Sequence, residues 1–227
     1  MSRGSLVVFA KRPRAGEVKT RLCPPFAPQQ AADLYAAMLA DVLEAAAADA
    51  ARHDLSAVLA VWPPEAAPEL AAQAPPAFRA VAQRGADLAA RLARALAEEL
   101  AGGAGKVLLR GSDSPALDAA AVDQAVAALD DHDLVLCPDL DGGYNLVGAR
   151  GPAPGLFDHP MSTERVLEQT RENARRLGLA TRVLEPRFDV DTADDLRALA
   201  RARRAGSDRC PRTLAWLDAH GLWPDPP

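Results

Sequence analysis

Residues 6–21 read LVVFAKRPRAGEVKTR and contain the pattern that decides the fold. The first five residues, Leu6–Ala10, form a short apolar run that is typical of a buried β-strand. A polar loop with many positive charges follows directly and continues through Arg21. In open α/β sheets, ligands bind at the carboxyl ends of the strands. A basic loop in this place therefore predicts the anion-binding edge of an α/β sheet.

The rest of the chain alternates apolar strand patterns with long helical ones. Expected strands cover residues 55–62, 78–82, 107–109, 134–137, 144–148 and 181–184, and expected helices cover 29–51, 87–100, 117–129, 163–177 and 192–204. A proline-rich loop is expected to follow residue 62 and to end at Pro76. The alternation predicts a three-layer α/β fold, in which a mainly parallel sheet is covered on both faces.

We expect one domain over residues 1–227, in which 207–227 form a C-terminal tail with a short helix near 214–220 and a proline-rich end. A chain of this length can bury a sizeable core without disulfides. The three cysteines are widely spaced, which fits a reducing compartment and argues against a zinc site.

Composition also limits the classes of partner. No apolar stretch is long enough to span a bilayer, so we expect a cytoplasmic protein without membrane contact. The net charge is −5 and no long basic block occurs, which argues against a nucleic-acid partner. A local basic cluster on an acidic chain instead favours a small anionic ligand. A homodimer is left open.

The basic loop carries five cations in the eleven residues from 11 to 21, against a single acid. Its candidate phosphate-binding residues are Lys11, Arg14, Gly16, Lys19 and Arg21. Glycine lets backbone N–H groups approach an anion, and the cations neutralise phosphate oxygens. The spacing is not that of a Walker A loop, and a merely solvated basic loop is the alternative.

A first candidate metal ligand is Asp113, which follows the expected strand 107–109 between small residues. Mg²⁺ and Mn²⁺ take oxygen ligands, and one or two carboxylates suffice when phosphates and water complete the shell. The alternative is that Ser112, Asp113 or Ser114 caps the following helix.

Two further acidic segments follow later strands. The segment PDLDGGY, residues 138–144, contains Asp141 before two glycines, which indicates a turn. The functional interpretation is that the Asp141 side chain faces a substrate that approaches the backbone of the two glycines. In FDVDTADDL, residues 188–196, Asp189 and Asp191 lie on the same side of an extended segment. Asp191 is a candidate helix cap as an alternative, and two close carboxylates need a positive charge between them.

Six segments in order, KRPRAGEVKTRL, QRGADLAARL, LLRGSDSPAL, PDLDGGYNLVG, FDHPMST and FDVDTADDL, resemble a bacterial family of GT-A-fold transferases. That family is described as selenodomain-associated, or arsenosugar-biosynthesis, glycosyltransferases. The resemblance runs from Leu6 to about Leu199. It implies the nucleotide-diphospho-sugar transferase fold, and it is shared in part with molybdenum-cofactor and phospholactate nucleotidyltransferases.

The resemblance also implies roles for individual residues. Lys19 and Arg21 match the phosphate-contacting loop, while Asp113 and Asp191 match the metal aspartates, with Asp189 beside them. The remaining expected site residues are Gly85 and Asp87 for the nucleotide, and Gly142, Gly143, Tyr144, Ser162 and Thr163 for the acceptor. Met161 stands where the family often has tryptophan, so this chain departs from the pattern on the acceptor side.

The function expected first is glycosyl transfer from a nucleotide-sugar donor to a small-molecule acceptor. Mg²⁺ or Mn²⁺ at Asp113 and Asp191 would stabilise the leaving diphosphate, and Asp141 would act as the acceptor's base. The alternative is nucleotidyl transfer from a nucleoside triphosphate to a phosphorylated or sugar acceptor, with release of pyrophosphate. A third alternative is a non-catalytic nucleotide-binding regulator.

Overall fold

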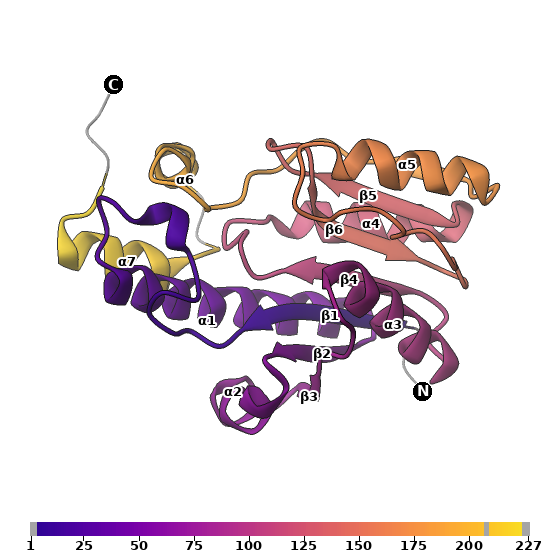
Figure 1. Cartoon of the computed structure of the whole chain (residues 1–227), viewed down its shortest axis with the longest axis horizontal. Helices are drawn as coiled ribbons and strands as arrows, with labels where there is room; N and C mark the ends of the chain where they lie inside the picture. Colours follow the sequence, from indigo (N-terminus) through magenta and orange to yellow (C-terminus); the bar gives the residue numbers. More distant parts are fainter. Residues whose placement is uncertain (1–3, 207–208, 224–227) are drawn as a thin grey trace.

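The computed structural model describes residues 4–206 and 209–223, and these form a seven-stranded sheet (Figure 1). Its strand order is β3-β2-β1-β4-β6-β5-β7. The strands are β1 (Gly4–Lys11), β2 (Leu55–Trp62), β3 (Phe78–Ala82), β4 (Val107–Gly111), β5 (Leu134–Pro138), β6 (Tyr144–Ala149) and β7 (Thr181–Val183). Among these described strands only β6 runs antiparallel to its neighbours. The expected mainly parallel sheet is confirmed.

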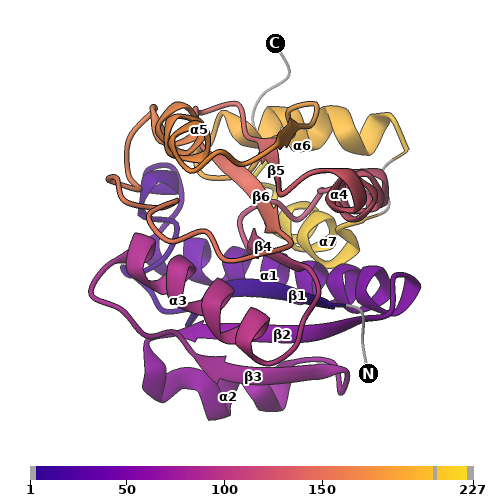
Figure 2. The same ribbon diagram turned by 90° about the vertical axis from the view of Figure 1, so that its right-hand side faces the viewer.

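Helices cover both faces of the sheet, which gives the three layers seen in Figure 2. The helices are α1 (Pro28–Arg52), α2 (Ala67–Gln73), α3 (Leu88–Ala101), α4 (Ala119–Asp131), α5 (Val166–Arg176), α6 (Asp195–Arg204) and α7 (Pro211–His220), with short 3₁₀ turns η1 (Thr20–Leu22) and η2 (Pro64–Ala66). Apolar residues of α1, α2 and α4 pack on one face of the sheet, and those of α3 and α5 pack on the other. None of the helices in the described residues is long and apolar enough to cross a bilayer.

Several element boundaries differ from the sequence expectation. The proline-rich segment expected as a loop contains η2 and α2, because Leu70 is buried in the core beside the sheet. The helix expected from 163 begins only at Val166, with Arg165 at its N-cap position. The last helix of the expected pattern likewise starts at Asp195 rather than at Thr192.

A separate apolar cluster positions the basic loop. Leu22 of η1 packs with Leu34 and Met38 of α1 and with Val190, and the cluster continues into α6 and α7. Lys19 directly precedes η1 and Arg21 lies within it, while Asp189 and Asp191 flank Val190. Burial of Leu22 and Val190 in one cluster therefore brings the basic loop and the late acidic segment together.

The helix expected near residues 214–220 begins at Pro211 and packs on α1. The fully buried carboxylate of Asp41 accepts hydrogen bonds from the backbone N–H groups of Arg212 and Thr213, at 3.1 and 2.8 Å, and from the Thr213 hydroxyl at 2.7 Å. Residues 207–208 and 224–227, which include most of the expected proline-rich end, lie outside the described residues.

Loss of this cap is expected to destabilise the fold. Asp41→Ala should lower the free energy of unfolding by about 2–4 kcal/mol, because three donors at the buried start of α7 lose their acceptor. Urea denaturation measures the change. Glu44→Ala, an exposed acid on the same helix, is the control and should change the value by less than about 0.5 kcal/mol. Equal effects of the two substitutions would contradict the assigned role of Asp41.

Candidate active site

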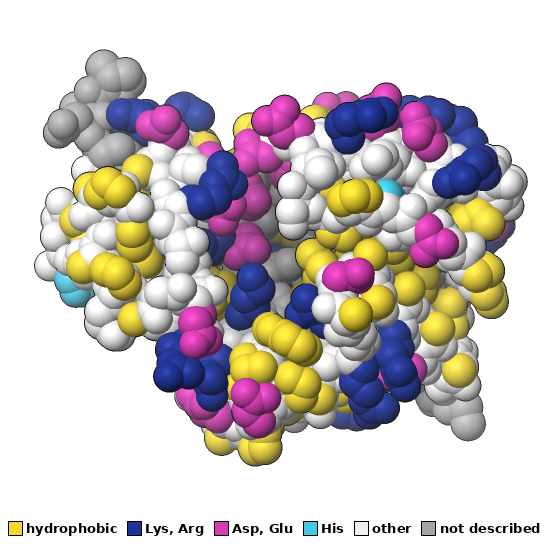
Figure 3. Space-filling view, in the orientation of Figure 1, with side chains coloured by type: hydrophobic (Ala, Val, Ile, Leu, Met, Phe, Trp, Pro, Cys, Tyr) yellow, Lys and Arg dark blue, Asp and Glu magenta, His cyan; other side chains and the backbone are white. Residues whose placement is uncertain are grey.

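A cleft of about 1450 Å³ opens at the carboxyl ends of the central strands. Figure 3 shows acidic and basic side chains gathered around the hollow in this face. The expected site residues that line the cleft are Lys11, Lys19, Arg21, Asp87, Asp113, Asp141, Gly142, Gly143, Tyr144, Ser162, Thr163, Asp189 and Asp191. Arg14, Gly16 and Gly85 do not line it; Arg14 instead pairs with Glu17 at 3.2 Å.

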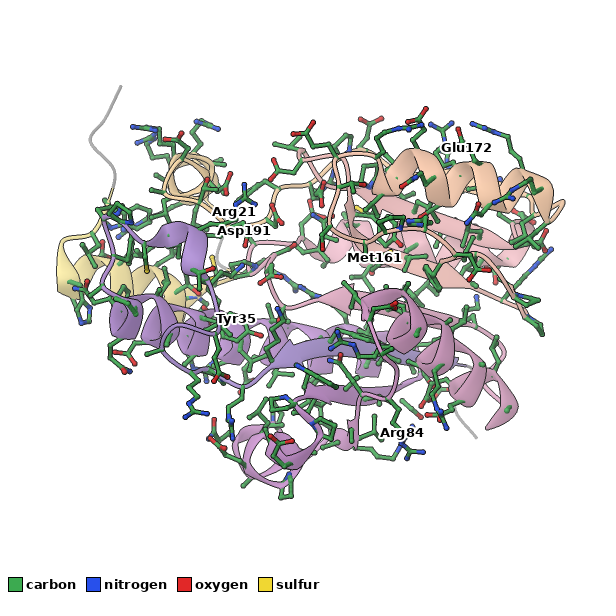
Figure 4. All side chains as sticks on the ribbon, in the orientation of Figure 1. Arg21, Tyr35, Arg84, Met161, Glu172 and Asp191 are labelled. Carbon is green, nitrogen blue, oxygen red and sulfur yellow. The ribbon has the colours of Figure 1, made fainter. Side chains whose placement is uncertain are left out.

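The ammonium of Lys19 joins the two aspartates from distant parts of the chain. Its Nζ lies 2.5 Å from Oδ1 of Asp113 and 3.2 Å from Oδ1 of Asp191, and the Lys19 side chain is only 3% exposed. Arg21 reaches the other oxygen of Asp191, with its Nη1 2.6 Å from Oδ2. In Figure 4 the labelled Arg21 and Asp191 lie next to each other, with Arg21 above. The positive charge that two close carboxylates need is thus supplied by the basic loop.

Neither aspartate serves as a helix cap, which was the alternative for each. The helix after Asp113 is capped by Asp118, whose Oδ1 accepts from the Ala121 N–H at 2.8 Å. At the later segment the N-cap position of α6 is held by Asp194. Asp195, the first residue of α6, accepts hydrogen bonds from the backbone N–H groups of Asp191 and Thr192 at 3.0 and 2.7 Å. Both candidate carboxylates are therefore available to the cleft.

A buried tyrosine connects the first strand to the Asp113 loop. The Tyr35 hydroxyl lies 2.7 Å from the Ser112 hydroxyl and accepts a hydrogen bond from the Lys11 N–H at 3.0 Å. Burial, together with the nearby charge of Asp113, raises the pKa of Tyr35 to about 12, so this side chain stays protonated and can donate. Tyr35 was missed in the sequence because its position fits the apolar stripe of a helix.

The acidic turn after β5 is organised by Asp139, which the sequence analysis did not select. Its Oδ1 accepts from the N–H groups of Asp141 and Gly143 at 3.0 and 2.7 Å, which is an Asx-turn that the Asp-x-Asp-Gly-Gly pattern could have indicated. At Gly142 the protein's own backbone comes close, because an added Cβ would lie 2.0 Å from the Glu164 carbonyl oxygen. The fold itself thus requires glycine at 142, while the approach of a substrate to this backbone stays a prediction.

The cleft holds more acidic than basic side chains around Lys19. Burial, and then the charges of Asp139, Asp113 and Asp191, raise the pKa of Asp189 to about 7, while Lys19 acts in the opposite direction. Burial also acts on Asp191, but the charges of Lys19 and Arg21 hold its pKa below the usual value. A cluster of hard oxygen donors with excess negative charge fits Mg²⁺ or Mn²⁺.

The number of protein ligands for such an ion is small. No group of three or more histidine, cysteine or acidic side chains within residues 4–206 and 209–223 is arranged to hold a metal. Both carboxylate oxygens of Asp191 already contact positively charged side chains, those of Lys19 and Arg21. Asp113 contacts Lys19 through Oδ1 alone, and its side chain is about half exposed. The residues therefore fit a divalent ion that takes one or two carboxylates here and completes its shell with phosphate oxygens and water.

At the other end of the cleft, Arg91 is held by three contacts. Its guanidinium carbon lies 4.2 Å from the centre of the Trp62 ring, its Nε donates to the Asp87 carbonyl at 3.0 Å, and its Nη1 donates to Oε1 of Gln83 at 3.4 Å. The Asp87 carboxylate instead caps α3 at the Ala90 N–H, although its i,i+4 spacing from Arg91 would allow a side-chain ion pair. Arg91 adds a preorganised cation that the sequence analysis did not select.

Behind the Asp113 loop lies a buried cation with few partners. Arg110 of β4 is 2% exposed and donates from Nη2 to the Ser114 carbonyl at 3.0 Å, but its Nε and Nη1 have no partner among the described residues. Burial lowers the pKa of Arg110 to about 10.

Arg110→Met should leave the free energy of unfolding unchanged or raise it by about 1–3 kcal/mol, because a buried charge is replaced by an apolar chain. Urea denaturation checks this, and a loss above about 2 kcal/mol would contradict it.

Comparison with known proteins gives relatives along most of the chain. The chain is 36% identical over 191 residues to a 3-phospho-D-glycerate guanylyltransferase of Phenylobacterium zucineum (strain HLK1), covering 81% of this chain and 84% of that protein. It is 32% identical over 191 residues to a phosphoenolpyruvate guanylyltransferase of Sphaerobacter thermophilus, covering 82% of this chain and 88% of that protein.

A solved structure from Desulfovibrio desulfuricans G20, provisionally described as a nucleotide-diphospho-sugar transferase, is 31% identical. It superposes with a TM-score of 0.88 over 98% of this chain and 97% of that one. The GT-A-type fold is confirmed, and the protein is a transferase enzyme. Neither curated relative supports a non-catalytic regulator.

The family model described as "Uncharacterized protein conserved in bacteria (DUF2064)" matches residues 43–163, more than half of the chain. That match covers α3, β4, β5 and β6, and with them the Asp113 loop and the Asp139 turn. The chain therefore belongs to the bacterial DUF2064 family.

Proposed function

We propose that the protein is a nucleotidyltransferase that joins a nucleoside triphosphate, with GTP as the expected donor, to a small phosphorylated carboxylic acid. The observation that carries this proposal is the cluster of Lys19, Asp113 and Asp191 in the cleft, beside the basic loop. The two guanylyltransferase relatives support the donor and the class of acceptor. The alternative named in the sequence analysis is therefore preferred over the glycosyl transfer that was expected first.

In this reaction an oxygen of the acceptor's phosphate attacks the α-phosphorus of the nucleoside triphosphate. The new P–O bond forms, the bond to the bridging β-phosphate oxygen breaks, and pyrophosphate leaves with the electron pair. Lys19 and Arg21 are placed to neutralise charge that grows on the phosphates, together with Lys11 on the same cleft wall. A divalent ion held by Asp113 and phosphate oxygens would add Lewis-acid stabilisation of the leaving group.

A phosphate acceptor changes what Asp141 has to do. The phosphate oxygen is already ionised near neutral pH, so the attack needs no general base. Asp141 is exposed on the Asp139 turn and contributes to the electrostatic environment of Arg21. We assign Asp141, with Ser162 and Thr163, which also line the cleft, to positioning of the acceptor.

Glycosyl transfer is the second candidate, favoured by the close similarity to the structure from Desulfovibrio desulfuricans. The resemblance to selenodomain-associated or arsenosugar-biosynthesis glycosyltransferases belongs to this candidate. The two candidates differ in their products. Nucleotidyl transfer releases pyrophosphate from a nucleoside triphosphate, whereas glycosyl transfer consumes a nucleotide-sugar and releases a nucleoside diphosphate.

An assay of pyrophosphate release tests the proposal. GTP, ATP, CTP and UTP are each incubated with Mg²⁺ or Mn²⁺ and with 3-phosphoglycerate, phosphoenolpyruvate or no acceptor. We expect release that is fastest with GTP and that requires one of the phosphorylated acids. Absence of release from every triphosphate with either acid would overturn the proposed function with these acceptors.

A further inference from the structure

The Lys19 ammonium occupies the position between the two carboxylates that the proposed function offers to a divalent cation. It lies 2.5 Å from Oδ1 of Asp113 and 3.2 Å from Oδ1 of Asp191. The side chain is 3% exposed, so the charge is enclosed by the protein rather than solvated. A buried lysine in this place is a counter-ion that the chain itself provides.

The carboxylates need this counter-ion when no ligand is present. Asp113 and Asp191 come from segments far apart in sequence, and both contact the same ammonium. Asp189 lies close enough for its charge state to be influenced by both of them. Without Lys19, like charges would face one another in a partly buried cleft, which disfavours the arrangement.

The same contact blocks a metal ion. Mg²⁺ binds carboxylate oxygens at about 2.0–2.1 Å and keeps a strict octahedral shell. An ammonium in contact with Oδ1 of both aspartates competes with a second cation for those oxygens, and the two positive charges repel each other. The second oxygen of Asp191 is held by Arg21, at 2.6 Å from its Nη1.

Nucleotide phosphates would remove the block. They bring anionic oxygens to the wall of the cleft formed by Lys11, Lys19 and Arg21. The lysine side chain is a flexible four-carbon stem that carries a point charge, so its ammonium can turn to a new anion while the backbone stays in place. The backbone of Lys19 is fixed at the start of η1, where its carbonyl accepts from the Leu22 N–H at 3.0 Å.

We propose that Lys19 is a resident counter-ion that keeps divalent cations off Asp113 and Asp191 until nucleotide phosphates draw its ammonium away. Metal and nucleotide then bind cooperatively, and the protein without nucleotide holds a divalent ion only weakly. This inference rests on the proposed function for the identity of the site. It adds an order of binding and a second role for Lys19 besides phosphate contact.

The test measures binding of Mn²⁺ alone, by electron paramagnetic resonance of the free ion, without nucleotide or acceptor. Lys19→Met should bind Mn²⁺ at least about tenfold more tightly than the wild type, because the competing cation is gone. Lys11→Met is the matched control, since it removes the same charge from an exposed position on the same cleft. It should change the affinity by less than about threefold, because the solvent screens it. Equal affinities of the two variants would overturn the inference.

A second measurement uses the wild-type protein and does not depend on the folding of a variant. Melting temperatures are compared with Mn²⁺ alone, a non-hydrolysable GTP analogue alone, and both together. The stabilisation by both should exceed the sum of the separate effects, because each ligand favours the state that binds the other. The analogue's own affinity for Mn²⁺ is corrected for with Asp113→Asn, in which this excess should disappear. Additive stabilisation in the wild type would overturn the inference.

The two proposals fail in different ways. If Lys19→Met binds Mn²⁺ more tightly but the wild type transfers a nucleotide to none of the acceptors, the proposed reaction is refuted and the counter-ion role of Lys19 stands. Transfer activity in the wild type, with unchanged Mn²⁺ affinity in Lys19→Met, would sink the counter-ion role and leave the reaction intact.

Discussion

Replacing Asp113 with asparagine is expected to lower kcat for pyrophosphate release by roughly 10²–10³-fold. Asparagine keeps the shape of the side chain but removes its charge. The variant loses the 2.5 Å ion pair with Lys19 and the most exposed carboxylate of the cluster. The stabilisation lost is electrostatic and is largest when charge moves onto the leaving pyrophosphate, so kcat should fall more than the affinity for GTP.

The measurement is steady-state pyrophosphate release, with thermal unfolding to confirm that the variant is folded. Asp131→Asn is the matched control, because Asp131 is an exposed acid at the end of α4 and does not line the cleft. It should keep the wild-type rate within about twofold, as expected for an exposed surface charge. A folded Asp113→Asn protein with the wild-type kcat would refute the assignment of Asp113 to the reaction.

Gly142→Ala should lower the free energy of unfolding by about 2–5 kcal/mol. Gly142 has a φ of +87°, which costs energy for any residue with a Cβ. The added Cβ would also lie 2.0 Å from the carbonyl oxygen of Glu164, which belongs to backbone and cannot move aside easily. The Gly142 carbonyl accepts from the Leu167 N–H at 2.9 Å, so the strain reaches the first turn of α5.

Gly151→Ala is the control for the same chemical change. An added Cβ at Gly151 has nothing within 4 Å, and its φ is not among the positive ones. The free energy of unfolding of this variant should lie within about 0.5 kcal/mol of the wild-type value, or slightly above it. Urea denaturation of both proteins decides the matter, and equal stabilities would show that the turn can adapt to a side chain at 142.

The fold was predictable because its signals are local. The alternation of apolar runs and helical stripes indicates a parallel sheet, and the strand-end rule places the basic loop and Asp113 at one edge. The same rule predicts that Asp191 approaches them, and the structure brings all three together through Lys19. Where the sequence left a cap as an alternative for Asp113 and Asp191, Asp118 caps α4 and Asp194 holds the N-cap position of α6.

What could not be predicted depends on contacts between distant segments. The ammonium of Lys19 between two carboxylates follows from packing of Leu22 on Val190, which no local pattern encodes. Nor does i,i+4 spacing show that Arg91 turns to Trp62 and Gln83, away from the Asp87 carboxylate. The glycine at 142 reads as a generic turn signal, and only the fold shows that Glu164 lies against it.

The most direct test of the central claim follows the α-phosphate of the donor. Wild-type protein is incubated with GTP labelled at the α-phosphorus, a divalent ion, and 3-phosphoglycerate or phosphoenolpyruvate, and the products are separated. The account predicts that the label appears in a new guanylylated acid while unlabelled pyrophosphate is released, and that Asp113→Asn forms both products roughly 10²–10³-fold more slowly. Label that stays in GTP with both acids, without release of pyrophosphate, would contradict it.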